Sequence, residues 1–534
     1  MSLEHSFTHL PTTVHALLDW RAGRDPQRVY VEIGDQNWTY GEVDRMSRRL
    51  ATQLAATGVS ADDRVLVLMP ASALHLGLWF AISRLGAIEV PINPAYKGVL
   101  LRQLVETAAP AICVVDEAFQ KEFRATCGGL LPDERILRPE DFADDGAVDV
   151  TLATDSAGPR DTSCIIFTSG TTGRSKGVMM SHSHQLSFGV AFAEIVDLAE
   201  DDVAYNFLPF FHIAAKFVAL GTMFAGGRML LRAGFSVSSF WNDVRAHGVT
   251  VCAAVGGLCH MLNSQSRSDK DADNPLRLIY AVPVPWEFKT DFEKRFGVDF
   301  VEGYGGTECN LVAYSRPSET TPRSSCGRPS PNFHVEVQDE LGYARGPGEP
   351  GEICVRPKHP GTMMNGYIGM PDKTLETMDD FWFHTGDRGF FDEGGYLFFL
   401  DRLKDAIRRR GENISSFEVE RILNSCDVVA ESAVVPVPSE LGEDEVKAFV
   451  VLKRPDAASE EDIFRYAAEN MPYFMVPRFI EFLPELPRTP TMKIRKIDLR
   501  TAVNGPATWD SAKAGLRAGR HGVENRGVPI AKVD

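Results

Sequence analysis

Short apolar segments rich in β-branched residues alternate with segments of helical periodicity over the first part of the chain. Arg64–Met69 (RVLVLM) has the composition of a buried strand, and Ala73–Leu85 follows it with helical periodicity. Strands separated by helices predict parallel sheets built from βαβ units. Further strands are predicted at Ala87–Pro91, Ala111–Val115, Cys164–Phe167, Val203–Leu208, Met229–Leu231, Val249–Ala253 and Leu276–Ala281. So many strands in one chain predict two sheets rather than one.

The pattern changes after about Ser324, where short strands between Gly and Pro clusters predict an antiparallel piece, a small β-barrel. A compact α+β pattern begins near Asp401, and the last residues are rich in Gly, Ala and Arg. The sequence therefore predicts an α/β protein in three parts. These are a large N-terminal domain (1–400) with two βαβ-type sheets and the small barrel, a smaller, mobile α+β C-terminal domain (401–511) and a flexible tail (512–534).

Charge and cysteine spacing exclude several classes of protein. The 534 residues carry 73 acidic and 56 basic side chains, a net charge of −17, whereas nucleic-acid binding as the main task needs a basic surface. No apolar run reaches the length of about 18 residues that a membrane span needs, and the N-terminus lacks the pattern of a signal peptide. Nine cysteines are scattered without C-x-x-C spacing, which predicts a reducing cytoplasm, buried packing thiols and no structural zinc.

A loop rich in Gly, Ser and Thr follows the predicted strand Cys164–Phe167 and contains Lys176. Glycines let backbone N–H groups approach an anion, hydroxyls donate further hydrogen bonds and the lysine supplies charge, a combination that suits a polyphosphate. It is not a Walker A loop, because Gly177 follows the lysine. The alternative is a flexible hairpin turn, although so many hydroxyls and glycines serve packing poorly. The candidate loop residues are Thr168, Ser169, Gly170, Thr171, Thr172, Gly173 and Lys176.

An ordered set of motifs that includes this loop resembles the adenylate-forming superfamily, which contains acyl-CoA synthetases, adenylation domains of peptide synthetases and luciferases. The resemblance covers nearly the whole chain. Several stretches, such as Glu469–Pro477 (ENMPYFMVP), are most similar to the crotonobetaine/carnitine-CoA ligase branch. The other matching motifs are Trp38–Glu42, Leu85–Pro94, Leu208–His212 (LPFFH), Tyr304–Glu308 (YGGTE), His384–Asp387 (HTGD), Asp401–Arg402, Arg410–Ile414 and Pro487–Lys493.

The resemblance implies an ATP site, and the residue types fit that chemistry. Tyr304 offers a flat face to adenine, Asp387 can accept from two vicinal ribose hydroxyls, and the Glu308 carboxylate suits a Mg²⁺ ion that bridges phosphates. The alternative for Glu308, taken alone, is a surface salt bridge. The alternative for Thr385–Asp387, taken alone, is a turn. Besides the loop, the implied ATP/AMP-binding residues are Gly303, Tyr304, Gly305, Thr307, Asp387, Arg402 and Lys493.

Lys493 is implied to catalyse adenylation, because a fixed ammonium stabilises the charge that develops when a carboxylate attacks the α-phosphate. The glycine that commonly precedes this lysine in the family is replaced by Met492. His212 is implied to orient the acid or to gate the pantetheine channel, and a packed core histidine is the alternative. The implied catalytic residues are Lys493, His212, Glu308 and Thr168, and Glu308 is also the implied metal ligand.

The implied reaction uses ATP, Mg²⁺ and coenzyme A: a carboxylic acid first forms an acyl-adenylate, and a thiol then displaces AMP. Lys404 resembles the hinge residue about which the C-terminal domain turns, and Arg410, Gly411 and Glu412 lie in the stretch that resembles the thiolation loop. No pair of aromatics with a carboxylate forms a clear cage for a quaternary ammonium. The sequence therefore predicts a small or medium acid without identifying it.

Other functions stay open at this point. The main alternative is an adenylation enzyme that loads an acyl group onto a carrier protein, and a luciferase-like oxygenase has no positive support. A degenerate nucleotide-binding regulator would lack Lys176, Glu308 or Lys493, all of which are present. The prediction is a cytoplasmic, AMP-forming acyl-CoA ligase with no nucleic-acid partner and no membrane span, and the resemblance allows a homodimer.

Overall fold

The computed structural model describes most of the chain and divides it into two compact units. Unit 1 comprises Met1–Pro94, Val105–Phe167 and Lys176–Leu403, and unit 2 comprises Ala95–Leu104, Thr168–Ser175 and Lys404–Asp534. The described residues are 11–142, 157–168, 175–284, 286, 288–402, 406–409, 412–439, 443–487, 494, 496–500, 504–519 and 522–525. No helix within these ranges combines the length and apolar character needed to cross a membrane.

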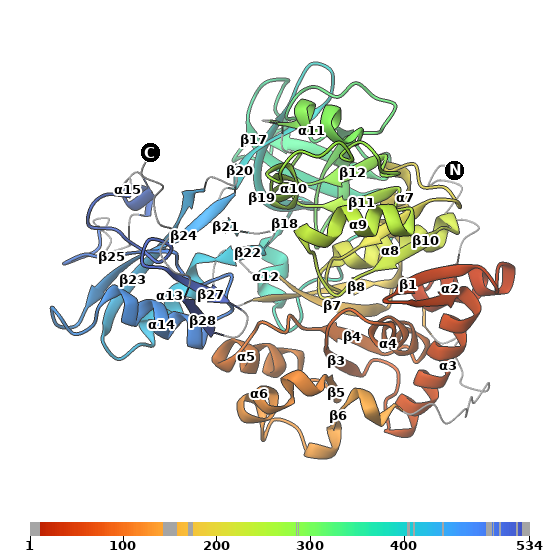
Figure 1. Ribbon diagram of the computed structural model, residues 1–534, viewed down its shortest axis with the longest axis horizontal. Helices are drawn as coiled ribbons and strands as arrows, with labels where there is room; N and C mark the ends of the chain where they lie inside the picture. Colours follow the sequence, from red (N-terminus) through yellow and green to blue (C-terminus); the bar gives the residue numbers. More distant parts are fainter. Residues whose placement is uncertain are drawn as a thin grey trace. The chain divides into compact units, whose positions relative to one another are not determined.

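A nine-stranded sheet forms one part of unit 1 (Figure 1). In spatial order its strands are β15 (Arg328–Pro329), β14 (Asn310–Tyr314), β13 (Asp299–Gly306), β12 (Leu278–Ala281), β11 (Val251–Ala254), β9 (Val203–Asn206), β10 (Arg228–Leu231), β1 (Val29–Ile33) and β2 (Gln36–Thr39). The strands from β13 to β1 pair in parallel, whereas β2, β14 and β15 add antiparallel pairs at the edges.

A second large sheet in unit 1 has six strands. In spatial order they are β6 (Ile136–Leu137), β5 (Ile112–Val115), β3 (Arg64–Leu68), β4 (Ile88–Pro91), β7 (Thr162–Thr168) and β8 (Lys176–Ser181). Parallel pairs join β3 to β4 and β5, β4 to β7, and β5 to β6. The two sheets confirm the prediction of βαβ architecture, and every strand predicted in this part of the chain overlaps an observed one.

Helices separate these strands along the chain, as βαβ connections require. The described helices up to residue 376 are α2 (Val14–Arg24), which precedes β1, α3 (Tyr40–Ala56), α4 (Ala73–Arg84), α5 (Gly98–Ala108), α6 (Glu117–Cys127), α7 (His182–Ile195), α8 (Ile213–Ala225), α9 (Val237–His247), α10 (Gly256–Asn263), α11 (Lys289–Phe296) and α12 (Pro371–Glu376), with 3₁₀ turns η1 (Asp133–Arg135) and η2 (Pro139–Asp141). Local signals set their ends. Thr39 and Glu42 form a capping box at the start of α3, and Gly226 ends α8 in the left-handed conformation.

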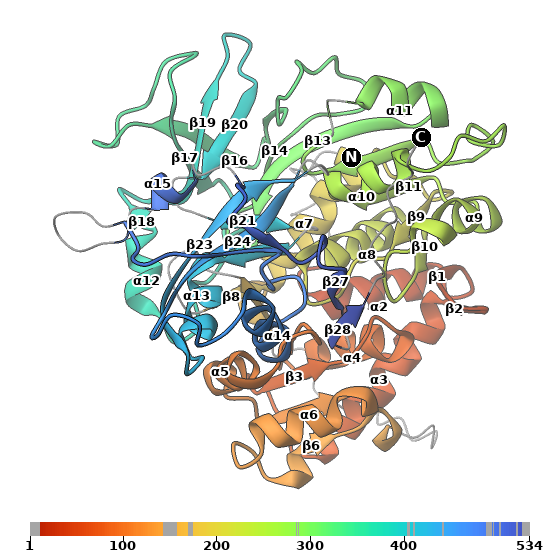
Figure 2. The ribbon, with the colours of Figure 1, turned by 60° about the vertical axis from the view of Figure 1, so that its left-hand side comes forward.

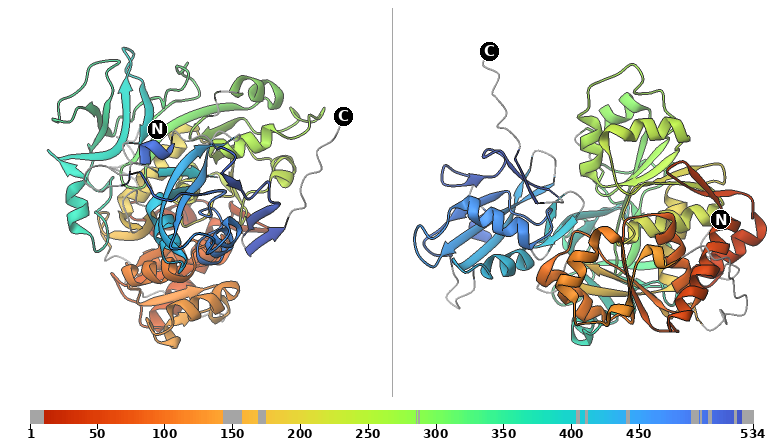
Figure 3. Two further views of the ribbon diagram at one scale, coloured as in Figure 1. Left: turned by 90° about the vertical axis from the view of Figure 1, so that its left-hand side faces the viewer. Right: turned by 60° about the horizontal axis from the view of Figure 1, so that its bottom comes forward.

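One hydrophobic cluster joins the inner faces of both large sheets to α2, α3, α4, α7 and α8. Because strand side chains alternate between faces, Val65 and Val67 of β3 and Met229 and Leu231 of β10 point into this cluster. The opposite face of the nine-stranded sheet packs against α9 and α11 through a separate cluster that includes Ile279. Figure 3 shows the resulting layers of helices and strands within unit 1.

The segment predicted as a small barrel is a five-stranded antiparallel sheet in unit 1. Its strands are β16 (Phe333–Gln338), β17 (Gly351–Pro357), β18 (Met378–Asp379), β19 (Trp382–Phe391) and β20 (Leu397–Arg402). They pair in the order β16-β17-β19-β18, with β20 also on β19, so the pairing path of these strands has ends and does not close into a ring.

Unit 2 is built around a four-stranded sheet with helices α13 (Ser416–Asn424), α14 (Glu460–Asn470) and α15 (Lys496–Arg500). The strands of this sheet are β23 (Val429–Pro438), β24 (Asp444–Leu452), β25 (Phe479–Phe482) and β26 (Trp509–Asp510). Two hairpins complete the described strands of the unit: β21 (Ala406–Arg409) with β22 (Glu412–Ser415), and β27 (Leu516–Gly519) with β28 (Gly522–Asn525). Helices α13 and α14 cover one face of the β23–β26 sheet (Figure 2), and Leu499 of α15 belongs to the cluster on the other face.

Part of the segment expected to be mobile, 512–534, forms the hairpin β27–β28. Leu516 and Ala518 of this hairpin are buried in the same cluster as α13 and α14. Two apolar side chains in alternate positions of a strand give no clear periodic signal, yet they are enough to attach the hairpin to the core of unit 2.

A charged pair is completely buried in the core of unit 1. Lys216 on α8 donates to Glu89 on β4 at 2.5 Å, and both side chains are 0% exposed. The Lys216 ammonium also lies 4.0 Å from the centre of the Trp79 ring, and His75 lies 3.4 Å from the other Glu89 oxygen. Burial alone would raise the pKa of Glu89, but Lys216 and His75 hold it below its ordinary value. The pair thus ties α8 to β4 and α4 through a charge interaction.

Candidate active site

Two of the motifs meet in unit 1 although they are far apart in the sequence. The Tyr304 hydroxyl on β13 donates to Asp387 Oδ2 on β19 at 2.8 Å. Burial, followed by the Asp387 carboxylate, raises the pKa of Tyr304 well above its ordinary value, so the phenol stays protonated and able to donate. Arg402 on β20 is paired with Asp387 across the sheet. An aromatic ring beside a carboxylate provides a flat surface for a base and an acceptor for sugar hydroxyls.

Close approach of neighbouring groups explains two glycines of the β13–β14 hairpin. A Cβ atom on Gly303 would lie 2.8 Å from the Tyr280 hydroxyl, and one on Gly305 would lie 2.1 Å from the carbonyl oxygen of Asn310. Both positions therefore require glycine. Thr307 lies in the turn of this hairpin and is partly exposed.

Lys176, Tyr367 and Glu308 form a second group in unit 1. The Lys176 ammonium lies 4.7 Å from the centre of the Tyr367 ring, and the Tyr367 hydroxyl donates to Glu308 Oε1 at 3.1 Å. Burial, followed by the Glu308 carboxylate, raises the pKa of Tyr367, which keeps this donor protonated. The structure thus places an ammonium and a carboxylate on either side of one tyrosine. Tyr367 was missed by sequence reasoning because it lies in no recognised motif.

His212 occupies the N-cap position of α8, with an extended backbone (φ −109°, ψ 140°). Its ring lies 4.7 Å from that of Phe211, and its backbone N–H donates to the carbonyl of Pro209 at 3.0 Å. The side chain is partly exposed. His212 is therefore a partly exposed residue at the start of the helix.

Glu302 is a buried carboxyl next to the Tyr304–Glu308 motif that sequence reasoning missed. It is 5% exposed, and the Trp286 Nε1–H donates to its Oε2 at 2.8 Å. Burial raises the pKa of Glu302 to about 7, and the hydrogen bond from Trp286 only partly opposes this. A signal was present in the sequence, since an acidic residue stands inside the apolar strand that leads to the motif.

Glu302 should make the stability of the protein fall as pH rises. The unfolded carboxyl loses its proton near pH 4.5, whereas the folded one keeps it until about pH 7. Between these values the folded state binds more protons, so the free energy of unfolding decreases with pH, by up to about 3 kcal/mol. Glu302→Gln keeps an acceptor for Trp286 and removes the titration. We expect its thermal midpoint to match that of the wild type near pH 4.5 and to exceed it above pH 7.

The matched control for this pH series is Glu340→Gln, which alters a carboxyl that is exposed to solvent. Its difference from the wild type should stay constant across the series. Equal pH profiles for Glu302→Gln and the wild type would show that the Glu302 carboxyl does not titrate in this range.

Unit 2 contains its own polar group beside a residue of the predicted thiolation loop. The Ser175 hydroxyl donates to Glu418 Oε1 on α13 at 2.5 Å. Burial, followed by the carboxylates of Glu418 and Glu412, raises the pKa of Tyr96. Glu412 begins β22 and is partly buried. Glu412 thus lies in the same negatively charged neighbourhood as Tyr96 and Glu418.

Several predicted site residues lie outside the described part of the chain. Thr168 is described and is the last residue of β7, and Arg402 is described through its backbone. The predicted residues that lie outside are Ser169, Gly170, Thr171, Thr172, Gly173, Lys404, Arg410, Gly411 and Lys493.

Comparison with known proteins identifies the family. A family model described as AMP-binding enzyme matches residues 18–368, and one described as AMP-binding enzyme C-terminal domain matches residues 418–493. The chain belongs to the AMP-binding enzyme family. Curated relatives include the crotonobetaine/carnitine–CoA ligase of Salmonella arizonae, which is 30% identical over 486 residues, covering 87% of this chain and 93% of the relative.

Solved structures of similar fold include acyl-CoA synthetases. The o-succinylbenzoate CoA synthetase of Bacillus subtilis, a double mutant bound to a product analogue, has a TM-score of 0.82 at 25% identity and covers 92% of this chain and 99% of its own. The fatty acyl CoA synthetase of Mycobacterium tuberculosis has a TM-score of 0.68 at 25% identity, and the match covers 92% of this chain and 98% of that synthetase. These relatives establish the class of enzyme: an ATP-dependent, AMP-forming acid–thiol ligase that uses coenzyme A and works through an acyl-adenylate.

Proposed function

We propose that the enzyme activates a small or medium carboxylic acid and transfers the acyl group to coenzyme A. The acid's carboxylate attacks the α-phosphate of ATP and expels pyrophosphate, and the thiol of coenzyme A then attacks the acyl carbon and expels AMP. The observation that carries the proposal is the hydrogen bond from Tyr304 to Asp387, which joins two motifs from separate sheets into one group. The curated relatives, named crotonobetaine/carnitine–CoA ligases, support an acid of modest size.

The nucleoside end of ATP is proposed to bind in unit 1. The Tyr304 ring would stack on adenine, and the Asp387 carboxylate would accept from the ribose hydroxyls. Arg402, opposite Asp387 in the sheet, would supply the second ribose contact. Gly303 and Gly305 flank Tyr304 and are proposed to contact the nucleotide through their backbone.

The phosphate end is proposed to lie against Lys176, Thr307 and the loop residues Thr168–Gly173. The Lys176 ammonium offsets phosphate charge, and hydroxyls and backbone N–H groups donate to phosphate oxygens. Mg²⁺ fits Glu308, because a partly exposed carboxylate is the kind of hard oxygen donor that this ion prefers. When bound there, Mg²⁺ would neutralise part of the charge on the phosphates.

The remaining predicted residues are proposed to bind the acid and to take part in the two half-reactions. His212 would orient the carboxylate of the acid or gate the thiol, and Lys493 would stabilise the charge on the α-phosphate. Lys404 is proposed as the hinge between domains 1–400 and 401–511. Arg410, Gly411 and Glu412 would form the loop along which the pantetheine arm passes.

A cytoplasmic location belongs to the same proposal. All nine cysteines are free thiols, and eight of them are buried, as expected in a reducing compartment. The proposed homodimer rests on the resemblance to the adenylate-forming superfamily.

The test is pyrophosphate release from purified protein with ATP, Mg²⁺ and a panel of acids, with and without coenzyme A. The panel contains short, medium and long fatty acids, aryl acids, crotonobetaine and carnitine. We expect turnover with one class of small or medium acid, and we expect it to increase when coenzyme A is added, because the thiol removes the bound adenylate.

The other outcomes separate the alternatives. Pyrophosphate release at a rate that does not change when coenzyme A is added would favour a carrier protein as the acceptor. Turnover confined to long fatty acids would contradict the proposed size of the acid. ATP binding without release for any acid in the panel would contradict the proposed reaction for this panel and favour a regulatory nucleotide-binding role.

A further inference from the structure

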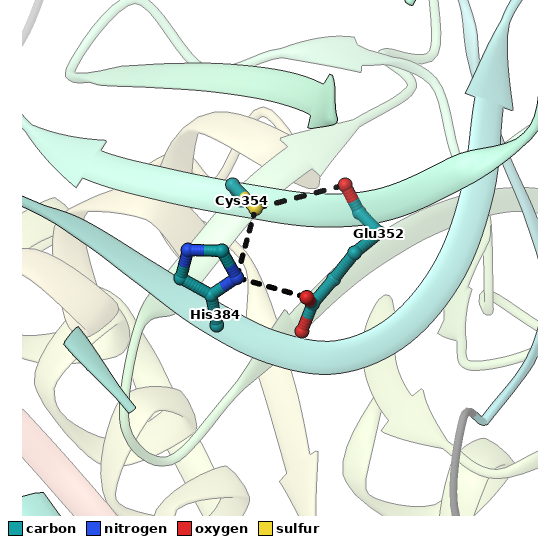
Figure 4. A group of neighbouring side chains, drawn as sticks. All are labelled: Glu352, Cys354 and His384. Atoms are coloured by element: carbon teal, nitrogen blue, oxygen red, sulfur yellow. Dashed lines mark hydrogen bonds and ion pairs between the residues drawn. The ribbon is translucent and has the colours of Figure 1, made fainter. Parts of the chain in front are cut away.

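Three side chains with different metal-ligating atoms meet on two neighbouring strands of unit 1. None of them has been given a role above, although His384 begins the motif that contains Asp387. Glu352 and Cys354 lie on β17, and His384 lies on β19. Cys354 and His384 are direct partners in the antiparallel pairing, and a register shift lies between Glu352 and Cys354. Figure 4 shows that the same ring nitrogen of His384 points towards both the thiol and the Glu352 carboxylate.

The distances between the ligand atoms suit a tetrahedral cation. Cys354 Sγ lies 3.6 Å from His384 Nδ1, and His384 Nδ1 lies 2.8 Å from Glu352 Oε2. Bonds from zinc of about 2.3 Å to sulfur and about 2.0 Å to nitrogen place these two atoms about 3.5 Å apart at a tetrahedral angle. The nitrogen–oxygen distance would have to lengthen by only about 0.5 Å.

The surroundings allow an ion to enter and hold the ligands in place. Cys354 is fully buried, whereas the side chains of His384 and Glu352 are 22% and 23% exposed, so solvent reaches the open side of the group. The backbone N–H of Gly386 donates to Glu352 Oε1 at 2.9 Å, which fixes the carboxylate and leaves Oε2 directed at the imidazole. Such outer contacts orient metal ligands in known sites.

The charge around these side chains also favours a divalent cation. The carboxylates of Glu352, Glu336 and Asp379 place negative charge near the Cys354 thiol. The same negative charges that disfavour a bare thiolate attract a cation, and the cation in turn stabilises the thiolate as its proton leaves to solvent.

We propose that Glu352, Cys354 and His384 form a binding site for a thiophilic divalent cation of the Zn²⁺ type, with water as the fourth ligand. Sulfur and imidazole ligands select such ions over Mg²⁺, which takes oxygen ligands. The site is therefore distinct from the one proposed at Glu308. Sequence reasoning expected no structural zinc because the cysteines lack paired spacing, but here β-sheet pairing, rather than a C-x-x-C motif, assembles the ligands.

The test uses Co²⁺ as a spectroscopic probe, added to the reduced full-length protein in buffer that contains excess Mg²⁺. We expect one equivalent of Co²⁺ to bind, with a thiolate-to-cobalt charge-transfer band in the near ultraviolet and strong visible bands typical of tetrahedral cobalt. Zn²⁺ should displace it. Cys354→Ser should abolish the charge-transfer band, and Glu352→Gln should weaken binding by at least the roughly 10–100-fold that loss of an outer-shell partner costs.

The matched control is Cys426→Ser, which removes the one thiol that is not fully buried and should leave the band unchanged. If Cys354→Ser does not fold, His384→Asn serves in its place, because it keeps the thiol and removes the imidazole. A band that persists in Cys354→Ser or His384→Asn overturns the proposal, and so does the absence of a band in the wild-type protein. None of these readouts uses catalytic turnover, so failure here and failure of the proposed function are separate results.

Discussion

Replacing Lys493 with alanine is expected to lower the rate of acyl-adenylate formation by about 10²–10³-fold, the usual cost of removing a preorganised charge from a developing oxyanion. The carboxylate of the acid and the α-phosphate of ATP are both negative, so their reaction needs a fixed positive charge between them. Pyrophosphate release with the best acid of the panel measures this rate. The second half-reaction, started from chemically prepared acyl-adenylate and coenzyme A, should be little affected if Lys493 acts only in the first.

The control for this substitution is Lys453→Ala, which removes an exposed lysine from the same unit and should leave both half-reactions unchanged. Lys496, three residues beyond Lys493, is less suitable, because its ammonium donates to Glu420 at 2.6 Å and to Ser416 at 2.7 Å within unit 2. A Lys493→Ala enzyme that forms the adenylate at nearly the wild-type rate would remove Lys493 from the proposed mechanism. Equal losses in both half-reactions would instead indicate damage to unit 2.

The fold was predictable because its signals are local. Many strands of the two large sheets are short apolar segments, such as β11, and several helices begin at a capping residue, such as the Thr39–Glu42 capping box. The order of the strands in the sheets was not predictable, since it depends on which segments pair across long separations. The same limit applies to the small antiparallel sheet, whose open pairing differs from the expected barrel.

The same distinction between local motifs and long-range contacts applies to the candidate site. Motif residues such as Tyr304, Asp387 and Glu308 could be named from the sequence, but their partners could not. Tyr367 joins Lys176 to Glu308 only because the chain returns to this place in the fold. The groups at Glu302 and Cys354 were missed for the same reason, because burial and cross-strand contacts give them their chemistry.

The buried pair of Lys216 and Glu89 leads to the second prediction with a large effect. Lys216→Met removes the ammonium and leaves the buried Glu89 carboxylate with only His75 beside it. Loss of one partner of a buried ion pair typically destabilises a protein by about 3–5 kcal/mol. The loss should grow as pH rises, because Glu89 without Lys216 can enter the folded core at low cost only when it is protonated. Urea or thermal unfolding at several pH values measures it.

The double variant Glu89→Gln/Lys216→Met should recover most of this loss, because no unpaired charge then remains in the core. As a surface comparison, Arg465→Met breaks an ion pair with Glu461 whose side chains are 44% and 45% exposed, and it should cost no more than about 0.5 kcal/mol. A Lys216→Met protein as stable as the wild type would mean that Glu89 is already neutral. Lys216 lies in the first turn of the helix that begins directly after His212, so the unpaired Glu89 charge in Lys216→Met should also slow adenylate formation. Recovery of this rate in the double variant would show that the unpaired charge, and not the loss of the pair itself, disturbs His212 through α8.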